Sequence, residues 1–150
     1  MDIGPYRFVH VCRIEPDRDV DGAVRSLMPQ ALFLNSRSLP LSKYGNGPFC
    51  KFRVPNTYKV SGVYAIQVDR TITYIGECAN LSSRYNSGYG NISPRNCYKG
   101  GQDTNCRLNN LIYSAASEGC KIDLWFHQTN NYKIVELELL AVQKWLWNRK

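Results

Sequence analysis

The chain lacks the paired cysteine and histidine spacings that mark structural zinc sites. Its six cysteines contain no C-x-x-C pair, and the two histidines, His10 and His127, follow no zinc-ligand spacing. An even count of cysteines is also compatible with three disulfides. We instead expect reduced, buried thiols, because a chain of 150 residues can fold around an apolar core without covalent cross-links.

Long apolar runs, a secretory leader, internal repeats and low-complexity segments are missing as well. A membrane-spanning helix needs about 20 consecutive apolar residues, and no run approaches that length. A secretory leader would place a shorter apolar run near the N-terminus. These absences predict a cytoplasmic protein that forms one compact domain overall.

Acidic residues are fewer than basic ones, which leaves a formal net charge of +7. The excess of Lys and Arg occurs in residues 1–60 and again in residues 61–150, so it does not come from a basic tail. A basic balance favours polyanionic partners such as nucleic acid, although many soluble proteins are equally basic without binding one. The charge alone therefore narrows the class of partner without deciding it.

Residues 1–60 contain strand and helix patterns but no recognisable catalytic constellation. Alternating apolar residues predict strands at 6–14 and 49–54, and residues 39–48 have the Pro and Gly content of a loop. Residues 20–34 have a helical pattern that Pro29 should end or kink. We expect this part to be an N-terminal β/α extension used for recognition or dimerisation.

Residues 61–150 have the pattern strand, strand, helix, helix, strand, helix. The expected ranges are, in order, 63–68, 72–75, 81–87, 104–118, 121–127 and 131–147. The short link Asp69-Arg70-Thr71 makes the first two strands a hairpin. We therefore predict an α+β fold in which helices flank a small antiparallel three-stranded sheet.

Helix ends and apolar faces follow from the same stretch. Asn80 can cap the first helix with Gly88 in a left-handed position at its end, and Asp103 or Thr104 can cap the second. Gly119 should stop the second helix, and Asn130 or Asn131 should cap the last. The expected buried faces are Leu108, Leu111, Ile112 and Ala115 on the second helix, and Ile134, Leu137, Leu140, Ala141 and Trp145 on the last.

Candidate catalytic residues are spaced along this core. Tyr64 and Tyr74 lie on facing strands of the hairpin, Arg84 follows on a helix, and Glu136 lies on the last helix with Asn148 twelve residues after it. Phosphodiester cleavage needs a proton acceptor, a cation near the developing charge and usually a metal ion. Each residue also has an ordinary structural explanation, such as a strand aromatic or a solvated helix residue.

Gly62-Val63-Tyr64 and Tyr74-Ile75-Gly76 resemble the two halves of the signature of the GIY-YIG nucleases, with Val63 in place of the middle Ile. Arg84, Glu136 and Asn148 follow in the order found in that family, so the resemblance covers residues 61–148. It implies a nuclease that leaves 5′-phosphate and 3′-hydroxyl ends.

The same resemblance assigns roles to the candidate residues. Tyr64 would accept a proton with support from Tyr74, Arg84 would stabilise the transition state, and Glu136 would bind one Mg²⁺ (or Mn²⁺), with Glu138 as a rival ligand. The pKa of a tyrosine is usually near 10, so a base role requires a nearby cation. Activity should then rise toward alkaline pH. Asn148 is expected to support the site structurally.

The segment from Arg84 to Arg107 combines cations, amides and aromatic residues in the manner of DNA-contacting loops. A polar surface loop is the ordinary alternative. Part of it, residues 100–107, resembles a segment of GIY-YIG restriction endonucleases. The candidate DNA-binding residues are Arg84, Tyr89, Arg95, Lys99, Gln102, Asn105 and Arg107.

The long DNA-binding regions, zinc fingers and second nuclease domains of other family members are not visible in this chain. It therefore looks most like a type II restriction endonuclease that cuts double-stranded DNA as a homodimer. One alternative is a phage or mobile-element nuclease of low specificity. A second is an inactive, nuclease-derived DNA-binding module.

Overall fold

The computed structural model describes residues 1–33 and 38–149, and these divide into two compact units. The first unit, here called the sheet unit, comprises Met1–Ile14, Val54–Arg84 and Cys120–Lys150. The second, the loop unit, comprises Glu15–Arg53 and Tyr85–Gly119. Each unit is assembled from separate stretches of chain. The role expected for residues 1–60 stays a prediction.

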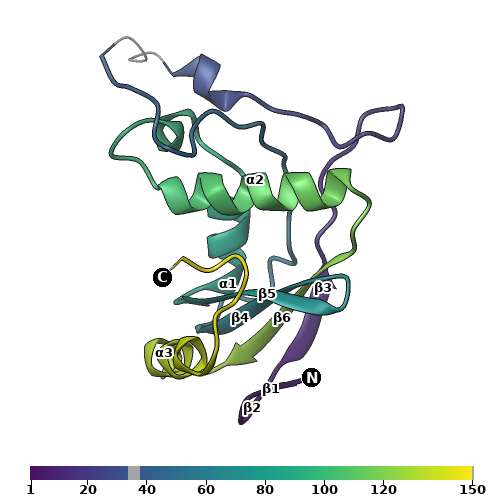
Figure 1. Cartoon of the computed structure of the whole chain (residues 1–150), viewed down its shortest axis with the longest axis vertical. Helices are drawn as coiled ribbons and strands as arrows, with labels where there is room; N and C mark the ends of the chain where they lie inside the picture. Colours follow the sequence, from purple (N-terminus) through teal and green to yellow (C-terminus); the bar gives the residue numbers. More distant parts are fainter. Residues whose placement is uncertain (34–37, 150) are drawn as a thin grey trace. The chain divides into compact units, whose positions relative to one another are not determined.

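The sheet unit contains a four-stranded antiparallel sheet in the order β3(Val9–Arg13), β6(Ile122–Gln128), β4(Gly62–Val68), β5(Thr71–Cys78) (Figure 1). The predicted three-stranded sheet is therefore wrong by one strand. The three predicted strands are present, and β3 pairs with β6, whose backbone N–H and C=O groups would otherwise form an open edge. A separate two-stranded sheet joins β1(Asp2–Ile3) to β2(Tyr6–Arg7).

The β4–β5 hairpin places the two candidate tyrosines on one face of the sheet. Tyr64 pairs with Gly76, and Ile66 pairs with Tyr74. Because side chains alternate between faces along a strand, Tyr64, Ile66 and Tyr74 all point the same way. Asp69 closes the hairpin in a left-handed conformation, with φ at 55°.

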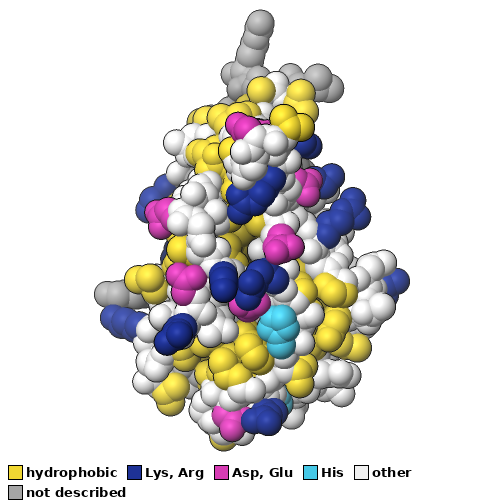
Figure 2. Space-filling model, turned by 90° about the vertical axis from the view of Figure 1, so that its right-hand side faces the viewer, with side chains coloured by type: hydrophobic (Ala, Val, Ile, Leu, Met, Phe, Trp, Pro, Cys, Tyr) yellow, Lys and Arg dark blue, Asp and Glu magenta, His cyan; other side chains and the backbone are white. Residues whose placement is uncertain are grey.

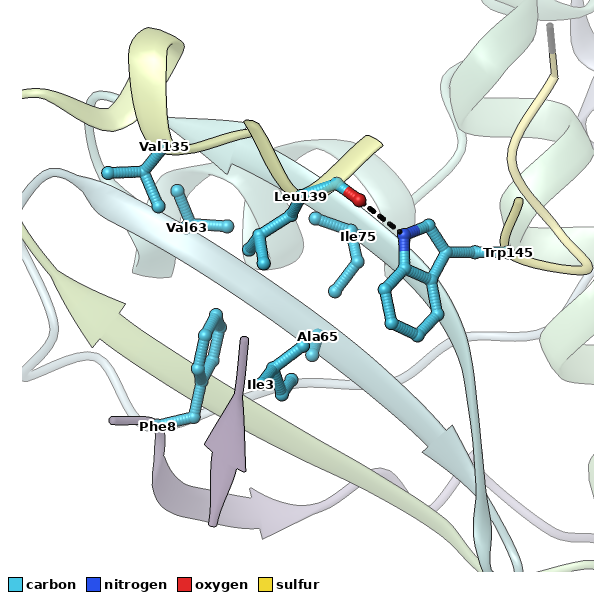
Figure 3. Packing of buried hydrophobic residues seen from close by; sticks show 8 residues of the cluster. All are labelled: Ile3, Phe8, Val63, Ala65, Ile75, Val135, Leu139 and Trp145. Carbon is cyan, nitrogen blue, oxygen red and sulfur yellow. Dashed lines mark hydrogen bonds between the residues drawn. The ribbon is translucent and has the colours of Figure 1, made fainter. Parts of the chain in front are cut away.

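The opposite face of the sheet packs against α3(Tyr132–Val142) through an apolar core (Figure 3). The residues buried in this core are Ile3, Phe8, Val63, Ala65, Ile75, Val135, Leu139 and Trp145. The apolar face predicted for α3 is partly wrong, because Ile134, Leu137 and Ala141 are exposed. Apolar residues occur on several sides of this helix, so helical periodicity could not identify the side that meets the sheet.

The last helix ends at Val142, before the predicted end at Trp147. Residues 143–149 leave the helix and return to the outer edge of β5, where the Trp147 N–H donates to the Thr73 carbonyl at 2.8 Å. In Figure 1 this segment is the yellow chain that follows α3. A tertiary hydrogen bond to the sheet edge thus replaces another helical turn.

The loop unit is built around α2(Asp103–Ser117). Gly119, the residue predicted to stop this helix, follows it with φ at 81°. Gln102 occupies its N-cap position without a side-chain hydrogen bond, so neither predicted cap forms. Leu108, Ile112 and Ala115 are buried as expected, and Leu111 is half-buried. A core of Phe49, Ile92, Cys97, Tyr98 and Cys106 lies in this unit.

The remaining predictions for this unit are mostly wrong. The helix expected at 20–34 is replaced by turns and by η1(Pro29–Leu32), while Leu34 lies outside the described residues. Pro29 lacks the backbone donor that a helix interior requires and begins the short 3₁₀ turn instead. Residues 49–54 form no strand beyond an isolated bridge between Leu27 and Phe49. The loop expected at 88–104 contains η3(Pro94–Cys97).

The helix predicted at 81–87 is divided between the units. α1(Leu81–Arg84) ends the second stretch of the sheet unit, and the Asn80 side chain caps it by accepting from the Ser83 N–H at 3.0 Å, as predicted. A π-helical turn, η2(Tyr85–Tyr89), opens the next stretch of the loop unit. Gly88 does not take up the predicted left-handed conformation. Across the described residues, no helix has the length and hydropathy to cross a membrane.

Candidate active site

The Tyr64 ring lies directly over Gly76 on the neighbouring strand. A Cβ atom added to Gly76 would lie 2.5 Å from both Cζ and Oη of Tyr64, which is closer than real Cβ contacts come. Gly62 has a similar role, since a Cβ there would meet the His127 carbonyl and the Phe126 ring. The two glycines therefore allow close approach of side chain and backbone at this hairpin.

Tyr64 and Tyr74 form a pair on the sheet. Their ring centroids are 6.1 Å apart with an interplanar angle of 26°. Tyr64 is 1% exposed and Tyr74 is 8% exposed, so both phenols are held in place by their surroundings. The predicted facing arrangement is present.

Arg84 and Glu136 lie close enough to affect each other electrostatically, although they are on α1 and α3. Burial raises the pKa of the Glu136 carboxyl above its usual value, Glu77 raises it further, and Arg84 opposes both effects. Arg84 is also close enough to Cys78 to limit the rise that burial causes in the pKa of that thiol, which reaches about 11. Arg84 thus acts on groups at both faces of β5.

The strand β5 lies between the tyrosine pair and the charged residues Glu77 and Glu136. Gly76 lies under the Tyr64 ring, and the next residue, Glu77, points to the opposite face, where Glu136 is found. The tyrosines and the carboxylates of Glu77 and Glu136 therefore lie on opposite faces of the same edge strand, and Arg84 lies near the Glu136 side. Sequence reasoning missed Glu77, although its place directly after the Tyr-Ile-Gly tripeptide was a usable signal.

Asn148 hydrogen-bonds the backbone of β5 on the edge that does not pair with β4. Its Oδ1 accepts a hydrogen bond from the Ile75 N–H at 2.9 Å, and its Nδ2 donates to the Ile75 carbonyl at 2.8 Å. Ile75 separates Tyr74 from Gly76 in the chain, so Asn148 holds the backbone that carries the site. These bonds give Asn148 a structural role in the strand, and its support of a catalytic site stays a prediction.

The acidic side chains of the site fit a hard divalent cation. Glu136 and Glu77 supply carboxylate oxygens, the donors that Mg²⁺ prefers, and a cation would relieve the cost of ionising Glu136. Within the described residues, no group of three or more His, Cys, Asp or Glu is arranged to bind a metal. The rival ligand Glu138 accepts a hydrogen bond from the Tyr6 phenol, which raises the Tyr6 pKa.

The candidate DNA-binding residues other than Arg84 belong to the loop unit and differ in exposure. Tyr89 and Asn105 are buried, and Asn105 donates to Gln102 Oε1 at 2.8 Å. Arg95 Nη1 donates to the Lys99 carbonyl at 3.1 Å. The side chains of Arg95, Lys99 and Gln102 reach the surface, and Arg107 is half-buried.

Charged side chains do not separate into patches of one sign on the face drawn in Figure 2, where Lys and Arg are interspersed with Asp and Glu. This distribution agrees with the sequence, in which the basic excess is spread along the chain. This face therefore presents no broad basic patch to a polyanion.

Comparison with known proteins relates the chain to a phage enzyme. It is 30% identical to Endonuclease II of Enterobacteria phage T4 over 86 residues, which is 57% of this chain and 58% of that protein. The matched region thus spans less than two thirds of its relative. A solved structure of a bacteriophage T4 EndoII mutant aligns with a TM-score of 0.49 and 21% identity, covering 74% of this chain and 87% of that one. No family model matches the sequence.

Proposed function

We propose that this protein is a metal-dependent DNA endonuclease of the GIY-YIG type that hydrolyses phosphodiester bonds to 5′-phosphate and 3′-hydroxyl ends. The observation that supports the proposal is that the β4–β5 hairpin pairs Tyr64 with Tyr74, while Arg84 and Glu136 lie close to each other beside the same strand, β5. The similarity to a phage endonuclease supports the same reaction class.

In this mechanism a water oxygen attacks the phosphorus, the bond to the 3′ oxygen breaks, and a proton is transferred to the departing oxygen. Tyr64, in its phenolate form, accepts the proton of the attacking water, and Tyr74 positions Tyr64 from the neighbouring strand. The departing 3′ oxygen takes its proton from a second water, and the hydroxide left behind restores the Tyr64 phenolate. Arg84 stabilises negative charge on the phosphoryl oxygens. Glu136, with Glu77 beside it, would bind Mg²⁺ or Mn²⁺, which supplies positive charge at the scissile phosphate.

Double-stranded DNA is the proposed substrate, and low sequence specificity is the reading that the phage relative favours. The alternative is a restriction endonuclease that recognises a specific sequence and acts as a homodimer. The two differ in their products, because a restriction enzyme yields discrete fragments from a plasmid whereas a nuclease of low specificity yields a smear. An inactive binding module would shift DNA without cutting it.

The decisive experiment incubates supercoiled plasmid with the protein and Mg²⁺ and compares it with two variants. Tyr64→Phe removes the proton acceptor and should slow cleavage by about 10²- to 10⁴-fold. Glu136→Ala removes the proposed ligand and should abolish cleavage, whereas the matched control Glu138→Ala should cut nearly as fast as wild type. Full activity of Glu136→Ala, or loss of activity only in Glu138→Ala, would reject the metal assignment.

A further inference from the structure

A pocket of about 390 Å³ lies in the sheet unit where α3 ends and the C-terminal segment turns back toward β5. Its volume is within the range of about 300–1,000 Å³ that is typical of ligand sites. The residues that line it are Leu140, Gln143, Lys144, Trp145, Asn148 and Arg149. None of these described lining residues is acidic, so the pocket combines an apolar wall with two cations.

The apolar wall of this pocket includes a residue of the core. Trp145 is 8% exposed and belongs to the core beneath the sheet, and its indole N–H donates to the Leu139 carbonyl at 3.3 Å (Figure 3). Lys144, Gln143 and Arg149 are exposed around it. An anionic group with a flat or apolar body matches this combination, because the cations can contact the charge while the body packs on Leu140 and Trp145.

The pocket adjoins the proposed active site at two points. Asn148 lines the pocket and also hydrogen-bonds the backbone of Ile75, between the residues that carry the site. Leu140 lies four residues after Glu136 on α3, which is one helical turn or about 6 Å. The pocket therefore begins about one helical turn along α3 from the proposed metal ligand.

We propose that this pocket binds a nucleotide of the substrate strand close to the cleaved bond. Lys144 and Arg149 contact its phosphate, and Leu140 and Trp145 face its sugar and base. This inference rests on the proposed nuclease function. It adds a substrate subsite formed by residues that follow α3, outside the set Tyr64, Tyr74, Arg84 and Glu136.

The first test compares the double variant Lys144→Ala/Arg149→Ala with the control Arg70→Ala/Lys121→Ala, which removes the same charge from elsewhere in the sheet unit. Cleavage of a short duplex should show KM raised about tenfold in the pocket variant with kcat changed much less. The slope of log affinity against log salt should fall by about 1 to 2, as expected for one or two lost phosphate contacts. Equal behaviour of the two double variants would overturn the proposal.

A second measurement separates this subsite from the cleavage reaction. Thymidine 3′,5′-bisphosphate is titrated into the full chain carrying ¹⁵N-tryptophan, and the Trp145 indole resonance is assigned from Trp125→Phe and Trp147→Phe variants. A saturable shift that the pocket variant loses and the control keeps supports the subsite. If wild type cuts DNA without such a shift, the pocket proposal fails and the nuclease function stands. If the shift occurs but no DNA is cut, the nuclease function fails and only nucleotide binding is supported.

Discussion

The Asn148 side chain hydrogen-bonds both backbone groups of Ile75, accepting from its N–H at 2.9 Å and donating to its carbonyl at 2.8 Å. The Trp147 N–H adds a bond to Thr73 at 2.8 Å on the same strand. These three bonds satisfy backbone groups along the open edge of β5, which would otherwise be exposed to water or to another strand. The segment after α3 therefore supports the strand that carries Tyr74.

Replacing Asn148 tests this support. Asn148→Asp keeps an acceptor for the Ile75 N–H but loses the donor to its carbonyl, whereas Asn148→Ala loses both. We expect free energies of unfolding lower by about 1–3 kcal/mol, with the Ala variant at the larger end, since partly buried backbone groups lose their partners. Urea denaturation measures the change, and Gln128→Ala at the end of β6 is the control. Unaltered stability in Asn148→Ala would contradict a supporting role.

Gly76→Ala should damage the site through a steric clash. The new Cβ would lie 2.5 Å from Cζ and Oη of Tyr64, and overpacking of this kind typically costs about 1–3 kcal/mol. The phenol must move, so cleavage should fall further than the loss of stability explains. Gly88→Ala is a suitable control, because its Cβ would meet atoms no closer than 3.6 Å. Equal activity of the two variants would show that the position of the Tyr64 ring is not critical.

Glu136→Gln should stabilise the metal-free protein at neutral pH while abolishing cleavage. The pKa of Glu136 is raised in the folded state, so its ionisation costs folding free energy. Wild type is therefore not destabilised by Glu136 below the unfolded-state pKa, where the carboxyl is protonated in both states. The folded state loses stability as the pH rises from there through the folded-state pKa. In EDTA, the variant should therefore have the higher Tm at pH 7 to 8, with the difference disappearing below about pH 4.

Mg²⁺ provides the control for this prediction. It should raise the Tm of wild type, because it binds the ionised carboxylate, and leave that of Glu136→Gln nearly unchanged. A Tm for Glu136→Gln below that of wild type in EDTA at pH 8 would contradict the assignment of an unfavourable buried charge.

Asp123→Asn tests how β3 is attached to the sheet. Burial disfavours the charged form, but hydrogen bonds from His10 and Arg13 on β3, at 2.9 Å and 3.3 Å, lower the Asp123 pKa overall. The resulting stability is present above the unfolded-state pKa and is lost as the pH falls through the folded-state pKa. We expect the variant to lose about 1 kcal/mol at pH 7.

The matched control is Asp2→Asn, which breaks the exposed ion pair with Arg7 and should change stability less. Denaturation midpoints measured from pH 7 to pH 2 give the comparison. The difference between wild type and Asp123→Asn should close toward acid pH, and a constant difference at every pH would show that the charge of Asp123 is not responsible.

Several features of the fold were predictable because they depend on neighbours in the sequence. The β4–β5 hairpin needs only alternation and a short turn, and the Asn80 cap and the Gly119 stop follow from local backbone chemistry. These predictions did not require any knowledge of distant contacts. The spacing of Tyr64 and Tyr74 does not by itself put both on one face, because the register next to the turn would separate them; an irregularity in the pairing between Ile66 and Gln67 brings both to the same face.

Other features depended on which surfaces meet. The exposed Ile134 and the buried Val135 differ only by a rotation of about 100° around α3, so the sequence could not select between them. The helix expected at 20–34 failed because the chain there forms isolated bridges, such as Leu27 with Phe49, instead of local helical bonds. The strand predicted at 6–14 contains β3, but its place in the sheet was missed because pairing between β3 and β6 joins residues more than a hundred positions apart.

The sequence by itself determined the hairpin, its two tyrosines and the order of Arg84 and Glu136 along the core, because spacing and local propensity decide these. Only the tertiary structure showed that Glu77 lies close enough to Glu136 to raise the pKa of its carboxyl, and that Asn148 hydrogen-bonds the backbone of Ile75. Both relationships join segments separated by more than fifty residues, and they exist only once α3 and the chain after it have packed against β5.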